Sequence, residues 1–253
     1  MTGGFPVFEH PGPIALAHRG GAGEAPENTM AAFANAVSLG YRFIETDIRA
    51  TRDGVLLAFH DEGLERVAGR PGRVVDLTWR ELREARVHGA EPIPRLDEVF
   101  EAWPEVRFVL EPKSDDAVEP LAELIRRGNA IDRICVSSFA ERRTERLRRL
   151  LGPGLCTALG RGGVARLRLS SLGLPAGRFR AAAALVPRRY RGLTVVDQRL
   201  LAAARRHGLR VKVWTVNEMA EMEQLLDLGV DGIITDRPSL LKSVLQARGL
   251  WPA

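Results

Sequence analysis

Short apolar runs alternate with segments of helical periodicity along most of the chain. The runs are rich in Ile, Val, Leu and Ala and predict buried strands, and the segments between them repeat apolar residues every three or four positions, as amphipathic helices do. The expected strands are Ile14–Ala17, Phe43–Arg49, Arg107–Glu111, Ile134–Ser138, Leu155–Ala158, Ala184–Val186, Arg210–Thr215 and Gly232–Thr235. The expected helices are Glu27–Leu39, Ala117–Arg127, Glu141–Leu150, Arg199–Arg206, Met219–Leu228 and Leu240–Arg248. Eight strands with intervening helices predict an α/β fold, a (β/α)₈ TIM barrel, and a doubly wound open sheet is the alternative.

Two stretches depart from this alternation. Residues 52–61 predict an extra hairpin arm after the second strand, in which Asp53-Gly54 supplies the turn. Residues 160–183 are rich in Gly, Arg, Leu and Ala and have no clear period. The connection between the fifth and sixth strands is therefore not predicted.

Residues 62–95 read as an insertion after the second strand. They contain one expected helix near Leu77–Glu84, which either Asp76 or Thr78 caps. The 253 residues fit a single barrel domain that includes this insertion, because such barrels commonly run to about 250 residues. We therefore expect one domain over residues 1–253.

The charge balance is basic, with a formal net charge of +5. Only Lys113, Lys212 and Lys242 among the 37 basic residues are lysine, and the arginines are scattered over many helices. No row of aromatic residues accompanies them, as a single-strand nucleic-acid surface requires. We expect no nucleic-acid partner, and the oligomeric state is not predicted.

The two cysteines, Cys135 and Cys156, lie in strand-like runs without disulfide or metal-ligand spacing. They predict buried free thiols in a reducing compartment. The N-terminus lacks a charged region followed by an apolar stretch, and no apolar run reaches about 18 residues. We expect a cytoplasmic protein with no stable membrane association.

Carboxylates stand at the ends of two neighbouring strands of the expected barrel. Glu45 and Asp47 have the same parity on the second strand, opposite to Ile44 and Ile48, whose face suits packing on the outer helices. Glu111 ends the third strand, with Lys113 on its parity. The three carboxylates are therefore expected to converge inside the C-terminal rim, where barrel active sites lie.

Three carboxylates at such short distances repel one another. At ~4 Å each pair costs about 4 kcal/mol at an effective dielectric constant of about 20. A hard divalent cation removes the repulsion, and an all-oxygen site suits Mg²⁺ or Ca²⁺. The alternative is a salt-bridge network with arginines, which does not require two histidines nearby.

His18 and His60 fall at strand ends beside these carboxylates and can transfer protons near neutral pH. The other three histidines are read as structural. Three carboxylates with a divalent cation leave one negative charge, which Arg19 and Lys113 convert to one positive charge. A phosphate diester carries one negative charge and balances it. The residues therefore indicate metal-assisted cleavage of a phosphate diester.

Several motifs together resemble the glycerophosphodiester phosphodiesterase family, in order from about residue 14 to 240. The motifs are His18-Arg19-Gly20, Glu24 with Pro26-Glu27-Asn28-Thr29, Glu45-x-Asp47, Asp53-Gly54 leading to His60-Asp61, Ile93-Pro94-Arg95-Leu96-Asp97-Glu98, Glu111-x-Lys113, Val213-Trp214-Thr215-Val216-Asn217 and Gly229-Val230-Asp231-Gly232-Ile233-Ile234-Thr235-Asp236. The resemblance implies a barrel with residues 62–95 as its insertion, and hydrolysis of glycerophosphodiesters to sn-glycerol 3-phosphate and an alcohol.

The resemblance also assigns roles at the matching positions. It implies an acid/base pair, three metal ligands for one divalent cation, two phosphate ligands and one pocket residue. The acid/base pair is His18 and His60, and the metal ligands are Glu45, Asp47 and Glu111. The phosphate ligands are Arg19 and Lys113, and the pocket residue is Trp214. A tryptophan in a barrel strand is equally expected to be core. We expect Glu27 and Asn28 to open the first helix.

Two departures from the family pattern are small. Pro112 replaces an aliphatic residue on the outward parity, and Arg95 stands where threonine is common, away from the chemistry. Two alternative functions remain at this point. A lysophospholipase D or a cyclizing lyase uses the same constellation, and a phosphate- or nucleic-acid-binding module uses the basic surface without chemistry.

Overall fold

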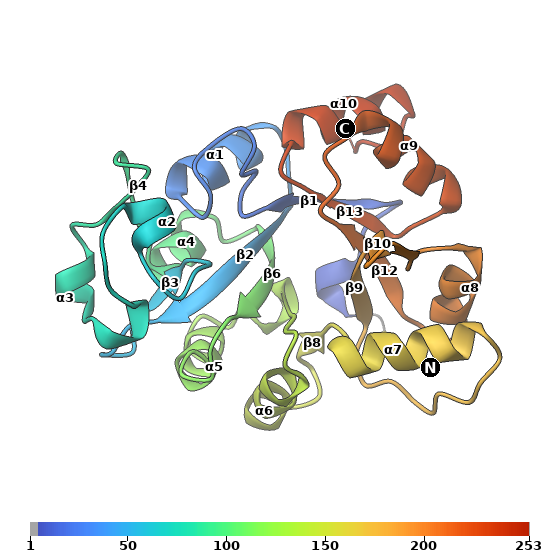
Figure 1. The fold of residues 1–253 in the computed structure, drawn as a ribbon, viewed down its shortest axis with the longest axis horizontal. Helices are drawn as coiled ribbons and strands as arrows, with labels where there is room; N and C mark the ends of the chain where they lie inside the picture. The colour runs from blue at the N-terminus through green and yellow to red at the C-terminus, as the bar shows by residue number, and fades with distance from the viewer. Residues whose placement is uncertain (1–4, 253) are drawn as a thin grey trace.

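The computed structural model describes residues 5–252, which form a barrel of eight parallel strands surrounded by helices (Figure 1). The strands are β1 (Ile14–His18), β2 (Phe43–Ala50), β6 (Arg107–Pro112), β7 (Ile134–Val136), β8 (Cys156–Thr157), β9 (Ala183–Pro187), β12 (Arg210–Trp214) and β13 (Gly232–Thr235). Each strand lies beside the one before it in this series, and β13 returns to β1, with Gly232 opposite Ile14. Between β8 and β9 the contact narrows to a bridge of Ala158 with Ala183. The predicted barrel is confirmed, and the open-sheet alternative is wrong.

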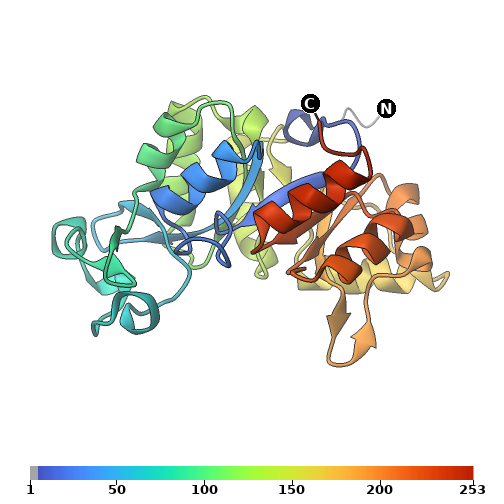
Figure 2. The same cartoon turned by 90° about the horizontal axis from the view of Figure 1, so that it is seen from above.

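Helices follow each barrel strand and cover the outside of the barrel (Figure 2). The helices are α1 (Met30–Ser38), α4 (Leu96–Ala102), α5 (Val118–Arg127), α6 (Glu141–Leu151), α7 (Arg161–Ser171), α8 (Gln198–Arg206), α9 (Met219–Leu228) and α10 (Pro238–Ala247). In residues 5–252 no helix has both the length and the apolar character needed to cross a membrane.

Two of these helices, α4 and α7, were not predicted. In α7 Gly162 and Gly163 are poor helix formers, and a tertiary contact compensates, since the Gly163 N–H donates to Glu141 Oε1 on α6 at 2.6 Å. In α4 the buried residues Leu96, Val99 and Phe100 do follow helical spacing, but the segment is short.

The predicted parity of the barrel strands is confirmed by the two packed layers. Ile44 and Ile48 point outward into the layer beneath the helices, whereas Phe43 and Val109 point into the barrel. Glu45 shares the inward parity of Phe43. The interior column of β2 therefore changes from apolar to acidic toward its C-terminal end.

The bottom of the barrel holds an unexpected charge. Lys212 is fully buried on β12, and its Nζ lies 3.2 Å from the ring centroid of Phe8 in the 3₁₀ helix η1 (Pro6–Phe8). Its Nζ has no hydrogen-bond partner in the described residues. The predicted free thiols Cys135 and Cys156 are confirmed as buried and unbridged, and they are paired in register across β7 and β8.

The expected hairpin arm is present. β3 (Leu56–Ala58) runs antiparallel to the end of β2, with Ala58 opposite Ile48, and Gly54 makes the turn with φ +81°. The Phe59 N–H donates to the Asp47 carbonyl at 2.9 Å. This bond places Phe59 beside Asp47, so the residues after β3 run back along β2 next to its carboxylates.

The insertion packs on the arm with an apolar cluster of its own, which includes Leu57, Leu64 and Leu82. Its elements are α2 (Glu65–Ala68), η2 (Val74–Asp76), α3 (Trp79–Leu82), β4 (Arg86–Val87) and β5 (Glu91–Pro92). The predicted helix near Leu77–Glu84 is thus confirmed in shorter form. Thr78 is its N-cap residue, and the Thr78 N–H donates to the Glu81 carboxylate at 2.7 Å.

The expected start of the first helix is wrong. α1 begins at Met30, and its N-cap is Thr29, whose side chain accepts a hydrogen bond from the Ala32 N–H at 3.1 Å. Asn28 has φ +54°, a left-handed conformation that cannot open a right-handed helix. Glu27 and Asn28 therefore belong to the loop between β1 and α1.

Candidate active site

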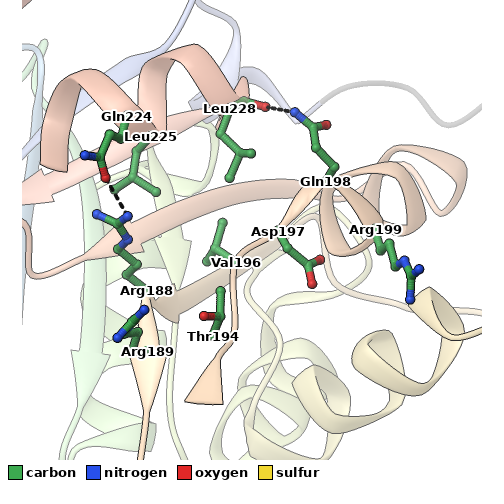
Figure 3. A pocket seen from close by; sticks show the side chains of 10 residues that line it. All are labelled: Arg188, Arg189, Thr194, Val196, Asp197, Gln198, Arg199, Gln224, Leu225 and Leu228. Atoms are coloured by element: carbon green, nitrogen blue, oxygen red, sulfur yellow. Dashed lines mark hydrogen bonds between the residues drawn. The ribbon is translucent and has the colours of Figure 1, made fainter. Parts of the chain in front are cut away.

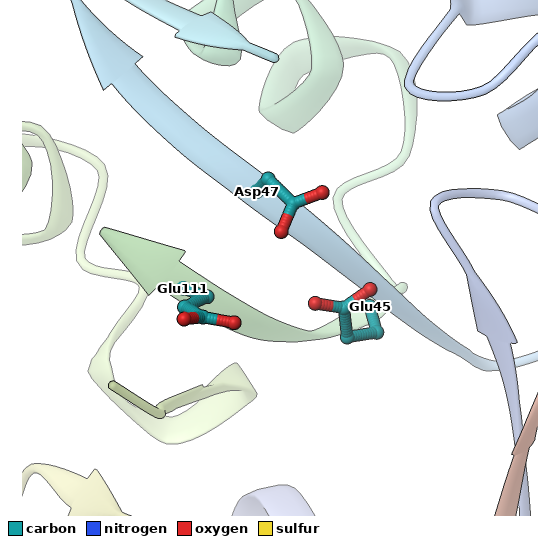
Figure 4. A group of neighbouring side chains, drawn as sticks. All are labelled: Glu45, Asp47 and Glu111. Carbon is teal, nitrogen blue, oxygen red and sulfur yellow. The ribbon is translucent and has the colours of Figure 1, made fainter. Parts of the chain in front are cut away.

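The three predicted carboxylates do converge (Figure 4). Asp47 and Glu111 are opposite each other in the β2–β6 register, and Glu45 precedes Asp47 on the same face. One oxygen from each carboxylate lies within 4.8 Å of the others. The Asp47 side chain is 2% exposed and that of Glu111 is 14% exposed, so the cluster is mostly buried and is more accessible at Glu111.

Positively charged side chains contact two of the three carboxylates. Lys113 Nζ lies 2.8 Å from Asp47 Oδ1 and 2.9 Å from Glu111 Oε2. Burial raises the pKa of Asp47, but the charges of Lys113 and Arg19 outweigh burial and hold that pKa below its ordinary value. The salt-bridge alternative is thus present for Asp47 and Glu111.

Glu45 differs from the other two carboxylates. Burial, followed by the nearby charge of Asp47, raises the pKa of Glu45 to about 7. In the described residues its only ion-pair partner is His18, whose Nε2 is 3.8 Å from Glu45 Oε2. Three carboxylates beside Lys113 and Arg19 leave one uncompensated negative charge. This all-oxygen donor set fits a hard divalent cation.

His18 is fixed by a carboxylate of its own. Its Nδ1 lies 2.6 Å from Asp236 Oδ1, and Asn217 Nδ2 in turn donates to Asp236 Oδ2 at 2.8 Å. Burial lowers the pKa of His18, but Asp236 and Glu45 outweigh burial and raise it. A bond from Nδ1–H to Asp236 leaves Nε2 directed toward Glu45.

His60 is held in the same way, by the carboxylate of the residue that follows it in the chain. Its Nδ1 lies 2.6 Å from Asp61 Oδ1, at the end of the arm after β3. Its side chain is 34% exposed, more than the 19% of His18. Each histidine thus has a carboxylate at Nδ1, and its Nε2 makes no hydrogen bond within residues 5–252, as a proton-transfer group needs.

Arg19 is held between two carboxylates in a left-handed backbone conformation of φ +53°. Its Nη1 donates to Glu27 Oε1 at 2.9 Å. Its Nε lies 3.1 Å from Asp47 Oδ2, but without hydrogen-bond geometry, so this buried N–H has no hydrogen-bond partner in the described residues. Gly20 permits the close packing behind it, because a Cβ there would lie 2.7 Å from the Phe33 ring.

Sequence reasoning gave no site role to Asn28 or Asp236. Asn28 Nδ2 donates to Asp47 Oδ2 at 3.1 Å, and Asn28 Oδ1 accepts from the Thr46 hydroxyl at 2.8 Å. Both residues lie in motifs quoted for the family resemblance, but in loops. Strand parity orients side chains on strands only, so it could not place them.

Trp214 lies at the C-terminal end of β12 and is half-buried. It has the inward parity of Lys212 and packs on the apolar interior of the barrel. Its ring also meets that of Phe139 edge to face, with centroids 5.9 Å apart. Trp214 can therefore belong to the apolar core and also line a pocket.

A groove of about 600 Å³ lies on a different part of the surface (Figure 3). It runs between α8, α9 and the hairpin of β10 (Arg189–Tyr190) with β11 (Leu193–Thr194). Its lining residues are Arg188, Arg189, Thr194, Val196, Asp197, Gln198, Arg199, Gln224, Leu225 and Leu228. None of the predicted site residues belongs to this groove.

Comparison with known proteins agrees with this geometry. The glycerophosphoryl diester phosphodiesterase family model matches residues 18–240. The "Probable glycerophosphodiester phosphodiesterase 2" of Mycobacterium tuberculosis is 41% identical over 258 residues, covering 98% of each chain.

Solved structures share this fold. The glycerophosphodiester phosphodiesterase of Agrobacterium tumefaciens is 26% identical, with a TM-score of 0.75 over 91% of this chain and 99% of that one. A phosphodiesterase of Oleispira antarctica, solved with the product sn-glycerol-3-phosphate, is 22% identical and has a TM-score of 0.78 over 93% and 97%. The chain described here therefore belongs to the glycerophosphoryl diester phosphodiesterase family and is a phosphoric diester hydrolase.

Proposed function

We propose that this enzyme hydrolyses small glycerophosphodiesters to sn-glycerol 3-phosphate and an alcohol, with one divalent cation, Mg²⁺ or Ca²⁺, held by Glu45, Asp47 and Glu111. The observation that carries the proposal is the carboxylate cluster itself, with two histidines that are each held by a further carboxylate: His18 lies beside Glu45, and the charge of His60 acts on Asp47. The product bound to the Oleispira antarctica phosphodiesterase supports the choice of glycerol phosphate. When bound, the cation supplies charge to orient the diester and to stabilise its developing negative charge.

Arg19 and Lys113 are the proposed phosphate ligands. The Arg19 Nε–H, which makes no hydrogen bond in the part of the chain that the structure describes, is a buried donor that a phosphoryl oxygen would satisfy. Lys113 bonds Asp47 and Glu111 in this structure, and its ammonium group would be available to the substrate once those carboxylates held a cation. Together with the three carboxylates and one divalent cation, they would give a site of charge +1, which a diester of charge −1 neutralises.

The two histidines divide the proton transfers in this proposal. His18 Nε2 faces Glu45 inside the barrel and takes the proton from the attacking oxygen, which is either water or the 2-hydroxyl of the glycerol. His60 is on the more exposed arm and gives a proton to the departing alkoxide. Trp214, with Phe139, is the proposed wall beside the alcohol.

The setting of the enzyme is also part of the proposal. We assign residues 1–253 to one domain with the insertion at 62–95, acting in the cytoplasm without a nucleic-acid partner or stable membrane association. The unbridged cysteines Cys135 and Cys156 support a reducing compartment.

A substrate panel tests the function. Glycerophosphocholine and glycerophosphoethanolamine should be turned over, with sn-glycerol 3-phosphate detected by a coupled assay, whereas phosphate monoesters should remain almost untouched because their second charge is uncompensated. Lysophosphatidylcholine in the same panel tests the lysophospholipase D alternative, and detection of a cyclic phosphate as the end product would identify a lyase. Monoester hydrolysis faster than that of every glycerophosphodiester would reject the proposal.

A further inference from the structure

Arg66, on α2 of the insertion, binds two carboxylates that come from different parts of the chain. Toward Asp61, its Nε donates to Oδ2 at 2.5 Å and its Nη2 to Oδ1 at 3.2 Å. Toward Glu27, its Nη1 donates to Oε2 at 2.8 Å and its Nη2 to Oε1 at 2.7 Å. Two edges of one planar guanidinium group are thus each engaged by a carboxylate, a geometry that an ammonium group cannot reproduce.

Each of these carboxylates leads to a different part of the site. Asp61 Oδ1 bonds His60 Nδ1 at 2.6 Å, and Glu27 Oε1 accepts from Arg19 Nη1 at 2.9 Å. A continuous series of polar contacts therefore runs from His60 through Arg66 to Arg19. It joins the proposed leaving-group acid to a proposed phosphate ligand through a residue of the insertion.

The charges along this series keep Asp61 and Glu27 ionised and paired with Arg66. Burial raises the pKa of Asp61, but Arg66 and His60 outweigh burial and lower that pKa to about 2. Burial likewise opposes the charge of Glu27, and Arg66 and Arg19 still lower its pKa. Both carboxylates bond the same Nη2 of Arg66, so without this guanidinium group two negative charges would face each other.

We propose that Arg66 is a positioning residue for the reaction: through Asp61 it fixes the Nδ1–H tautomer and orientation of His60, and through Glu27 it fixes the guanidinium group of Arg19. This inference rests on the proposed function. The simpler role is an anchor for the insertion. Arg73 serves as the matched comparison for that role, because it also pairs with two carboxylates, Glu62 and Asp76, within the insertion.

Kinetics of single variants separate the two roles. Arg66→Gln should lower kcat on glycerophosphocholine about 10- to 100-fold, the usual effect of losing a partner that orients an active-site group. The loss should be smaller on a nitrophenyl glycerophosphodiester, whose leaving group needs no proton. Arg66→Lys should remain impaired, since it keeps the charge but cannot bond both carboxylates bidentately, and Arg73→Gln should behave like wild type.

Glu27→Gln tests the other branch. It leaves the Arg66–Asp61 contact intact and weakens the hold on Arg19, so it should raise KM more than it lowers kcat. Full activity of Arg66→Lys, or equal losses on both substrates with a lowered melting temperature, would overturn the positioning role.

A measurement independent of turnover reads the contact directly. In ¹⁵N-histidine NMR spectra at alkaline pH, wild-type His60 should be the Nδ1–H tautomer, and Arg66→Gln should shift it toward a mixture. His18 is the internal control, because Asp236 holds it without Arg66. An unchanged His60 tautomer in folded Arg66→Gln would overturn the inference. A wild-type enzyme inactive on every glycerophosphodiester would reject the proposed function instead, and the tautomer would still decide the role of Arg66 toward His60.

Discussion

Lys212 is a buried titratable residue that the proposed chemistry does not use. Burial lowers its pKa to about 8, from an ordinary value of 10.5. Gly232 lies opposite it in the register, and a Cβ there would lie 2.7 Å from the Ile14 carbonyl oxygen and 3.2 Å from Lys212 Cγ, so the glycine leaves room for β1 and for the lysine stem. A charged amine without a hydrogen-bond partner destabilises the fold.

Lys212→Met should remove this destabilisation, and the gain in the free energy of unfolding over wild type should depend on pH. Between about pH 8 and 10.5 the unfolded chain holds the Lys212 proton and the folded chain does not, so this residue makes stability rise with pH. The shift corresponds to about 3 kcal/mol. The variant should be more stable than wild type at pH 7 and lose that advantage by pH 10.5, as measured by urea unfolding. A difference that does not change with pH would contradict the buried charge.

At the scale of elements, sequence periodicity predicted what strands position and missed what loops position. All eight barrel strands, the hairpin arm and the parity of Glu45, Asp47 and Glu111 follow from local pattern and are confirmed. Asn28 and Asp236 depend on loop conformation and on contacts across the barrel, which no local period encodes. Helix α7 likewise needs its contact with α6.

The two histidines stand on different elements, and their variants should differ accordingly. His60→Ala should lose about 10²–10⁴-fold on glycerophosphocholine and far less on a nitrophenyl glycerophosphodiester, because general acid catalysis matters only for the poor leaving group. His18→Ala should lose similar amounts on both substrates. Rescue of His18→Ala by the nitrophenyl substrate would exchange the two roles, and equal losses in all four measurements would remove the assignment.

At the scale of the whole molecule, the barrel brings together groups that lie far apart in sequence. β1, β2 and β6 supply His18 and the carboxylates, the arm supplies His60, and the residue after β13 supplies Asp236. The three carboxylates, together with the positively charged side chains of Arg19 and Lys113, still leave the site with a net negative charge. We propose that a divalent cation on these carboxylates makes the site active.

Removal and return of the metal test this proposal. Enzyme stripped by a chelator, and shown empty by elemental analysis, should release no sn-glycerol 3-phosphate from glycerophosphocholine. Mg²⁺, Ca²⁺ or Mn²⁺ should restore turnover at one ion per chain, while Glu45→Ala and Glu111→Ala should stay inactive although their melting shows a folded barrel. Full activity of the metal-free wild-type enzyme in the presence of chelator would contradict the account.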